Sequence, residues 1–175
     1  MDKAVQLTPD EYRRVLTFFE KAVAAEPARW SYWCDIGFCR GRLGQWQEAV
    51  AAFERVVGIA EVTAPVLSML GHAYIKLGRY PDAEAILNKA HALAPDNLNI
   101  LYEMALVRCH RGEIEMALLP LQQIVRHKPR HVKAQFNLGV LYHRLHEQQA
   151  AERQIDIVRD LDQKFADRLA KIVLS

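Results

Sequence analysis

Small residues recur along this chain at a fixed interval of 34 positions. One series is all alanine and the other, twelve positions earlier, is mostly glycine: Ala49, Ala83, Ala117 and Ala151, and Gly37, Gly71, Ala105 and Gly139. Two helices that cross closely leave room for only a small side chain at their contact, and a stack of similar helix pairs repeats that contact. A single irregular core imposes no such rule. The interval therefore predicts a stack of helix–turn–helix units.

The expected turns and ends of these units keep the same interval. Glycine follows the first helix in three units, at Gly44, Gly78 and Gly112, and His146 takes that position in the fourth. Glycine adopts the left-handed conformation that ends a helix at little cost, so the fourth turn is expected to be the least secure. Proline closes three units in register, and two other residues hold the same column: Pro27, Pro95 and Pro129, with Glu61 and Gln163 as the exceptions.

These columns resemble the tetratricopeptide-repeat (TPR) family. The small residue of the first helix, an aromatic residue three positions before the alanine (Trp46, Tyr80), the alanine itself and the closing proline carry the resemblance. It implies an all-α fold, an α-solenoid of antiparallel helix pairs that forms a TPR superhelix. The expected organisation is one TPR domain over residues 1–175, with these parts: a half-repeat at 8–27, repeats at 30–63, 64–97, 98–131 and 132–165, and a C-terminal capping helix that continues the last repeat to about residue 174.

Several helix ends can be predicted from capping chemistry. Thr8 is an expected N-cap, with Pro9 in the first turn and Glu11 completing a capping box. Thr63 and Asp96 are expected caps of later helices.

Two features of the C-terminal half concern the shape and the number of its helices. Pro120 lies inside a helix and removes the hydrogen bond to the carbonyl of Met116, which predicts a bend. After Ala151 the apolar ladder continues without glycine or proline, which leaves two alternatives: one long terminal helix, or two helices joined near residues 160–163.

Composition narrows the functional classes. Of the 175 residues, 51% are hydrophobic and 25% are charged, and the net charge of +2 is too small to predict a nucleic-acid partner. The chain has no apolar run of membrane-spanning length, and its first 25 residues lack a signal-peptide pattern, so a cytoplasmic protein is expected. Its three cysteines, Cys34, Cys39 and Cys109, are expected to be unpaired small apolar residues.

The sequence offers little support for catalysis or for a bound cofactor. It contains no Gly-rich phosphate loop and no nucleophile elbow. His143 and His146 are helical neighbours, and His127 and His131 flank a proline, but no carboxylate or thiolate completes a metal site with either pair. We expect no enzyme activity, no cofactor and no metal, so the function has to come from the surface.

The TPR resemblance implies that the first helices line a concave groove that holds a peptide or a helix of a partner protein. Transferred position by position, the candidate groove residues are Phe38, Arg42, His72, Lys76, Tyr102, Leu106, His110, Phe136, Val140 and Arg144. The second half of this wall is apolar and aromatic, and a basic stripe follows one edge. The stripe has two explanations, which are compatible: binding of acidic groups, or cations that stabilise the C-terminal ends of helices by about 0.3–1 kcal/mol each.

The expected function is therefore a non-enzymatic protein–protein interaction module that acts as a scaffold or adaptor. Its expected partner is an extended or helical protein segment with apolar anchors and acidic flanks. The alternative is a dedicated cytosolic chaperone for a secreted or membrane-inserting protein, since the first full repeat also resembles small bacterial TPR chaperones of type III secretion translocators and TPR scaffolds of assembly systems. The apolar half of the wall could instead be covered by the N-terminal helix or by a second copy, so self-association stays open.

Overall fold

The computed structural model describes residues 7–59 and 62–175, which form ten α-helices and no strand. The fold is an α-solenoid of helix pairs, as the sequence predicts. Residues 1–6 and 60–61 lie outside the described residues, and with them the exceptional column position Glu61. The helices divide between two compact units, the first ending at Pro95 and the second beginning at Asp96.

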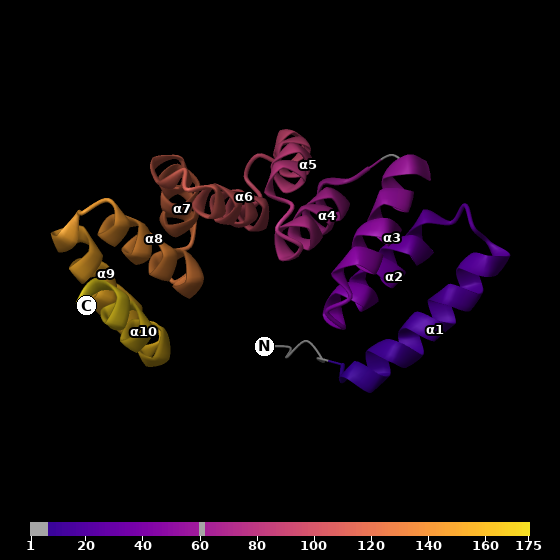
Figure 1. Ribbon diagram of the computed structural model, residues 1–175, viewed down its shortest axis with the longest axis horizontal. Helices are drawn as coiled ribbons and strands as arrows, with labels where there is room; N and C mark the ends of the chain where they lie inside the picture. Colours follow the sequence, from indigo (N-terminus) through magenta and orange to yellow (C-terminus); the bar gives the residue numbers. More distant parts are fainter. Residues whose placement is uncertain (1–6, 60–61) are drawn as a thin grey trace. The chain divides into compact units, whose positions relative to one another are not determined.

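Five helices make up the first unit (Figure 1). They are α1 (Pro9–Ala25), α2 (Trp30–Arg42), α3 (Trp46–Ile59), α4 (Ala64–Lys76) and α5 (Tyr80–Leu93). Each helix packs on the next along the chain, and α2 also contacts α4.

Five further helices make up the second unit. They are α6 (Leu98–Arg111), α7 (Ile114–His127), α8 (Val132–Arg144), α9 (Gln148–Arg159) and α10 (Gln163–Val173). Neighbours in the chain again pack together, and α10 packs on α8 as well as on α9. The ladder after Ala151 therefore forms two helices, which decides between the alternatives that the sequence left open.

The small residues lie where the helices of a pair approach each other. All four alanines of the repeat are 0% exposed. A Cβ atom added to Gly37 would come within 2.7 Å of the Phe53 ring, and one added to Gly71 within 2.7 Å of Leu87. In each case a first helix presses directly against a large side chain of its second helix.

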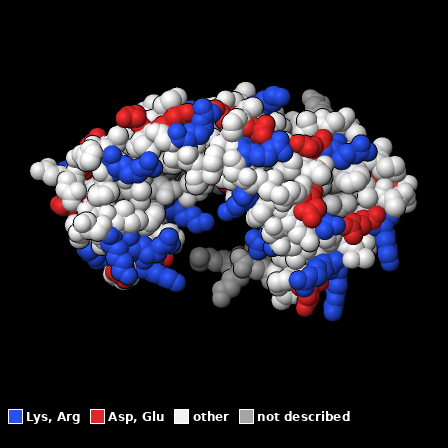
Figure 2. Space-filling view, in the orientation of Figure 1, with Lys and Arg blue, Asp and Glu red and all other residues white. Residues whose placement is uncertain are grey.

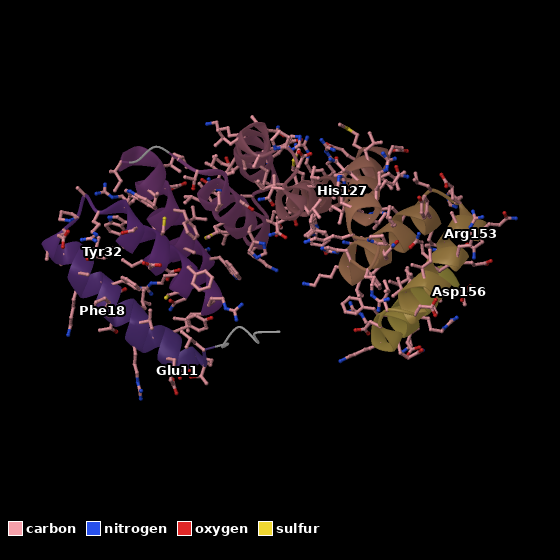
Figure 3. All side chains as sticks on the ribbon, turned by 180° about the vertical axis from the view of Figure 1, so that it is seen from behind. Glu11, Phe18, Tyr32, His127, Arg153 and Asp156 are labelled. Carbon is pink, nitrogen blue, oxygen red and sulfur yellow. The ribbon has the colours of Figure 1, made fainter. Side chains whose placement is uncertain are left out.

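The helix starts follow capping chemistry, with one correction. The Thr8 amide donates to Glu11 Oε2 (2.6 Å) and the Glu11 amide donates to Thr8 Oγ1 (3.3 Å), which confirms the predicted capping box; Glu11 is labelled in Figure 3. The prediction that Asp96 caps α6 is wrong. The cap is Asn97, whose side chain accepts from the amides of Asn99 (3.0 Å) and Ile100 (3.4 Å).

The turns inside the helix pairs share one backbone conformation. Gly44, Gly78 and Gly112 have φ values of 77°, 71° and 78°, and His146 has a φ of 60° at the equivalent position. The fourth turn thus keeps the left-handed geometry of the other three, although a residue with a Cβ atom adopts it only at a steric cost.

Pro120 lies inside α7, and a side chain of the neighbouring helix α6 compensates for the hydrogen bond that the proline removes. Proline has no N–H, so the carbonyl of Met116 has no donor within α7. Arg108 of α6 donates from Nη1 to that carbonyl oxygen at 2.9 Å. The helix runs through Pro120 without a break. The bend expected there stays a prediction.

No helix among residues 7–59 and 62–175 combines the length and the apolar character needed to cross a lipid bilayer.

Candidate functional site

The candidate groove residues of the first unit come from α2 and α4. Phe38 of α2 is 47% exposed, and its ring lies 6.1 Å from the ring of the buried Tyr12 of α1. One turn further along α2, the exposed Arg42 places its guanidinium carbon 5.3 Å from the centroid of the same Tyr12 ring. We call these three residues the Tyr12 cluster.

The next repeat has the same arrangement. The His72 ring of α4 lies 5.7 Å from the ring of Trp46 of α3, and the exposed Lys76, one turn later, places Nζ 5.9 Å from a Trp46 ring. We call these three residues the Trp46 cluster. An exposed cation over an aromatic face gains about 0.5–1 kcal/mol, so each ring restrains the basic side chain above it.

The two clusters are related by the sequence repeat. Tyr12 and Trp46 are 34 positions apart, as are Phe38 and His72, and Arg42 and Lys76. The sequence reasoning missed Tyr12 as part of the site. The available signal was its register: Tyr12 precedes Trp46 and Tyr80 in the same column, which places α1 where the second helix of a preceding repeat would lie.

Tyr102 and Leu106 of α6 are half-buried in the second unit. The Tyr102 hydroxyl accepts a hydrogen bond from Asn137 Nδ2 (3.1 Å), and its ring lies 5.6 Å from that of His131. Burial raises the pKa of the Tyr102 phenol, so this hydroxyl stays protonated at neutral pH. Tyr102 therefore joins α6 to α8 and shows only part of its ring to solvent. His110 and Arg144 are exposed at the last turns of α6 and α8.

Phe136 and Val140 of α8 already have an intramolecular partner. Both pack against the buried cluster of α9 and α10, and the Phe136 ring lies 5.6 Å from that of Phe165. The guanidinium carbon of Arg168 lies 5.5 Å from the Phe136 centroid and 5.6 Å from that of Phe165. The sequence reasoning considered the N-terminal helix or a second copy as the cover for these residues. In the structure the C-terminal helix α10 covers them.

The three cysteines are unpaired, and their thiols are not activated. Burial raises the pKa of all three, that of Cys34 to about 11, with the nearby Asp35 carboxylate adding to the shift for Cys34 and Cys39. A thiol with a raised pKa is largely protonated at neutral pH and is a poor nucleophile or metal ligand. Within the part of the chain that the structure describes, no three His, Cys, Asp or Glu side chains gather into a metal site.

Charge is distributed unevenly over the helices. Figure 2 shows mainly basic side chains over α10 at the lower left of the view. The basic residues of α10 are spaced by four and three positions: Lys164, Arg168 and Lys171. α10 therefore has an apolar face on the second unit and a basic face next to it.

Aromatic side chains also follow the junction of α1 and α2. The ring of Phe18, which is 65% exposed, lies 5.3 Å from Phe19, which lies 5.9 Å from Tyr32; Phe18 and Tyr32 are labelled in Figure 3. The Arg29 guanidinium carbon lies 4.9 Å from the Tyr32 centroid. None of these residues lies in the predicted groove columns.

Two family models, both of the tetratricopeptide repeat, match residues 27–96 and 68–126, and together they span more than half of the chain. The chain belongs to the tetratricopeptide-repeat family. Among curated relatives, the TPR chain is 27% identical over 133 residues to superkiller protein 3 of Schizosaccharomyces pombe, covering 76% of this chain and 10% of the relative. It is 22% identical over 155 residues to anaphase-promoting complex subunit 3 of the same organism, covering 89% of this chain and 23% of the relative.

Solved structures give the same fold. YrrB, a TPR protein described as having an unusual peptide-binding site, matches with a TM-score of 0.79 at 22% identity, over 93% of this chain and 84% of that one. MamA from Desulfovibrio magneticus RS-1, from its residue 41 to its end, matches with a TM-score of 0.80 at 20% identity, over 92% and 98%. At these identities the likeness concerns the fold alone. The TPR chain spans about a tenth of the length of superkiller protein 3 and under a quarter of the anaphase-promoting complex subunit.

Proposed function

We propose that this TPR chain is a non-enzymatic protein–protein interaction module, a scaffold or adaptor. It binds a segment of a partner on the inner columns of its first helices, by which we mean the columns of the candidate groove residues. TPR proteins are generally interaction modules rather than catalysts. Two relatives carry names of multiprotein assemblies, the superkiller complex and the anaphase-promoting complex, and YrrB is described by a peptide-binding site. The repeat boundaries that the sequence predicts are proposed together with this function, as the units of the module.

The observation that carries the proposal is the repeated geometry of the Tyr12 and Trp46 clusters. Stabilisation of a helix end requires only that a cation be near the last turn. Here each cation lies over an aromatic ring from a neighbouring helix, beside a second ring, and the arrangement recurs in the next repeat. A restrained side chain loses less conformational freedom when a ligand binds, so the clusters are preorganised for a partner.

The chemistry of the two clusters indicates which chemical groups a partner segment should carry. Phe38 offers an exposed aromatic surface, which suits an apolar anchor, and Arg42 and Lys76, which share the basic column next to it, suit carboxylates beside that anchor. We infer a partner segment, extended or helical, with apolar anchors and acidic flanks. In the second unit, Tyr102, Leu106 and His110 form the corresponding columns of α6.

The test begins with affinity capture from the native host and identification of stoichiometric partners. Phe38→Ala should weaken binding of such a partner about tenfold or more, because buried aromatic anchors concentrate the energy of most interfaces. Phe18→Ala is the matched control, since Phe18 is more exposed and lies outside the columns. Arg42→Glu with Lys76→Glu should mainly slow association and change its salt dependence.

Binding constants from calorimetry, together with circular dichroism to verify the helical content, decide the outcome. If Phe38→Ala binds every captured partner as tightly as the unchanged chain does, the inner columns are not the binding surface. A partner that binds normally but is degraded in cells lacking this chain would favour the chaperone role over the scaffold role.

A further inference from the structure

Two aromatic rings that are partly open to solvent mark the place where α8 and α10 meet. The rings of Phe136 and Phe165 pack in a T-shape with centroids 5.6 Å apart, and both side chains are half-buried. Ile172 lies seven positions after Phe165, on the same side of α10, and is 38% exposed. The meeting point of the two helices therefore offers a small apolar surface to a partner.

A guanidinium group lies over this ring pair. The guanidinium carbon of Arg168 is 5.5 Å from the Phe136 centroid and 5.6 Å from the Phe165 centroid, although the side chain as a whole is exposed. Contact with two rings restrains the side chain and leaves its N–H donors to other groups. The second unit thus has a cation held over aromatic rings, as in the Tyr12 and Trp46 clusters, but here α10 supplies the cation.

Arg168 belongs to a row of cations along the exposed side of α10, within the basic surface at the lower left of Figure 2. Lys164 lies four positions before it and Lys171 three positions after it, and both are exposed. None of the three forms an ion pair with another described residue. Asp167, the acidic residue of α10, instead accepts a hydrogen bond from Gln163 Nε2 (2.7 Å). The charge of the row is therefore left for a ligand.

The spacing of the row indicates the form of that ligand. A helix rises about 1.5 Å per residue, so the three cations follow one another at about 6 Å and 4.5 Å along the axis of α10. Acidic side chains three or four positions apart on a second helix have the same spacing. Side chains on one face of an extended segment are about 7 Å apart and lose register along the row.

The surroundings of the row indicate the chemical class of the ligand. A phosphate backbone calls for a wide basic field, whereas this chain has a net charge of only +2. The ring pair beside Arg168 suits an apolar side chain, and a guanidinium suits a carboxylate, which it can bind through two parallel hydrogen bonds. Together these features favour an acidic protein helix that carries an apolar residue.

We propose that this surface, here called the α8–α10 edge, docks an acidic helix of a partner protein; it consists of Phe136, Phe165, Lys164, Arg168 and Lys171. Carboxylates three or four positions apart on that helix pair with the three cations, and one apolar side chain packs on the two rings. α10 stays in its place, and the α8–α10 edge is exposed as the chain is folded. The inference rests on the proposed function, because it takes the partner to be a protein, and it adds a surface in the second unit.

The test uses the full chain and a fluorescein-labelled alanine-based peptide of about 20 residues, long enough to form a helix. The peptide carries Glu at positions i, i+4 and i+7 and one Leu beside them. In fluorescence anisotropy, Lys164→Glu with Lys171→Glu should raise the Kd about tenfold or more, because two attractions become repulsions. A peptide with Ala in place of Leu should bind the unchanged chain about fivefold more weakly, because it lacks the apolar contact.

The matched control is Arg126→Glu with Arg153→Glu, which changes the net charge equally at exposed positions of α7 and α9; Arg153 is labelled in Figure 3. Its Kd should stay within about threefold of that of the unchanged chain, since these residues lie outside the α8–α10 edge. Circular dichroism verifies that both variants keep their helical content. Equal weakening in the two variants would mean that the peptide responds to net charge alone, and would overturn the proposal.

Repeating the titrations with Arg42→Glu and Lys76→Glu in the chain separates this surface from the inner columns of the first unit. Peptide binding that survives there and is lost on adding Lys164→Glu with Lys171→Glu supports the α8–α10 edge. Binding that is lost there but unchanged in the Lys164→Glu, Lys171→Glu chain would overturn this inference and leave the proposed function standing.

Two further outcomes would overturn the proposal. One is no binding of the peptide to the unchanged chain. The other is that duplex DNA or phosphatidylserine vesicles bind in its place and are lost in the Lys164→Glu, Lys171→Glu chain, which would assign the cations to phosphate groups.

Discussion

Single residues set how closely the helices of each pair approach. Gly71 lies against the fully buried Leu87, so even one added methyl group has no room there. Gly58 of α3 has the opposite surroundings: it is exposed, and a Cβ atom added to it would meet no atom within 4 Å. The same substitution should therefore have opposite effects at the two sites.

Gly71→Ala should lower the free energy of unfolding by about 1–3 kcal/mol, because the new methyl group overpacks the contact with Leu87. Gly58→Ala should raise it by about 0.5–1 kcal/mol, because alanine favours the helix and has less freedom in the unfolded chain. Urea titrations monitored by circular dichroism measure both values. Equal unfolding midpoints for the two variants would show that Gly71 is not in a close contact that excludes a methyl group.

His146 keeps a left-handed conformation where the other turns have glycine. His146→Gly should raise the free energy of unfolding by about 0.5–1 kcal/mol, since relief of the steric cost exceeds the added freedom of the unfolded chain. Gly112→Ala, at the equivalent turn, should lower it by about 1 kcal/mol. Thermal denaturation of the two variants measures both changes in stability. A loss of stability in His146→Gly would show that the backbone of His146 is not strained.

The residue-scale predictions from the sequence succeeded where the cause is local in the chain. The Thr8–Glu11 capping box needs only four consecutive residues, and the left-handed turns need only one. Asp96 and Asn97 are both good capping residues in adjacent positions, and local chemistry could not decide which of them ends up at the cap.

At the scale of elements, α6 and α7 depend on each other through Arg108 and Pro120. Arg108→Met should lower the free energy of unfolding by about 1 kcal/mol, because the Met116 carbonyl loses its donor. In a Pro120→Ala background the restored N–H of residue 120 supplies that bond within α7, and Arg108→Met should cost little. A double-mutant cycle in urea measures the coupling. Equal costs in the two backgrounds would show that the hydrogen bond from Arg108 does not compensate for the proline.

Contacts between elements marked the limit of the sequence reasoning. The 34-residue interval predicted the helix pairs, since it reports a contact that every repeat makes. The sequence also led us to expect a C-terminal capping helix, but the interval could not predict that α10 packs on Phe136 and Val140 of α8, because it reports only contacts that recur. Tyr12 was missed for a different reason: Phe38 and Arg42 lie 26 and 30 positions after it in the chain, and only its column with Trp46 and Tyr80 indicated the contact.

At the scale of the whole molecule, the chain forms two compact units, and each helix packs mainly on its neighbours. Perturbations in different units should therefore act independently. Gly71→Ala and His146→Gly lie in different units, and the stability of the double variant should equal the sum of the two single effects within about 0.5 kcal/mol.

Hydrogen exchange locates the same effect along the chain. Gly71→Ala should speed exchange in α4 and α5 and leave α8 and α9 unchanged. A deviation from additivity well beyond that margin, or faster exchange throughout both units, would mean that the chain unfolds as one cooperative body.

The hydrogen bond from Arg108 to the Met116 carbonyl also constrains the order in which the sequence can drift. A lineage that first replaces Pro120 regains the helical bond and can then lose Arg108 with little penalty. A lineage that first replaces Arg108 must pass through a weaker intermediate with an unmet carbonyl. The hydrogen bond therefore favours one order of replacement over the other for two residues that are twelve positions apart in the chain.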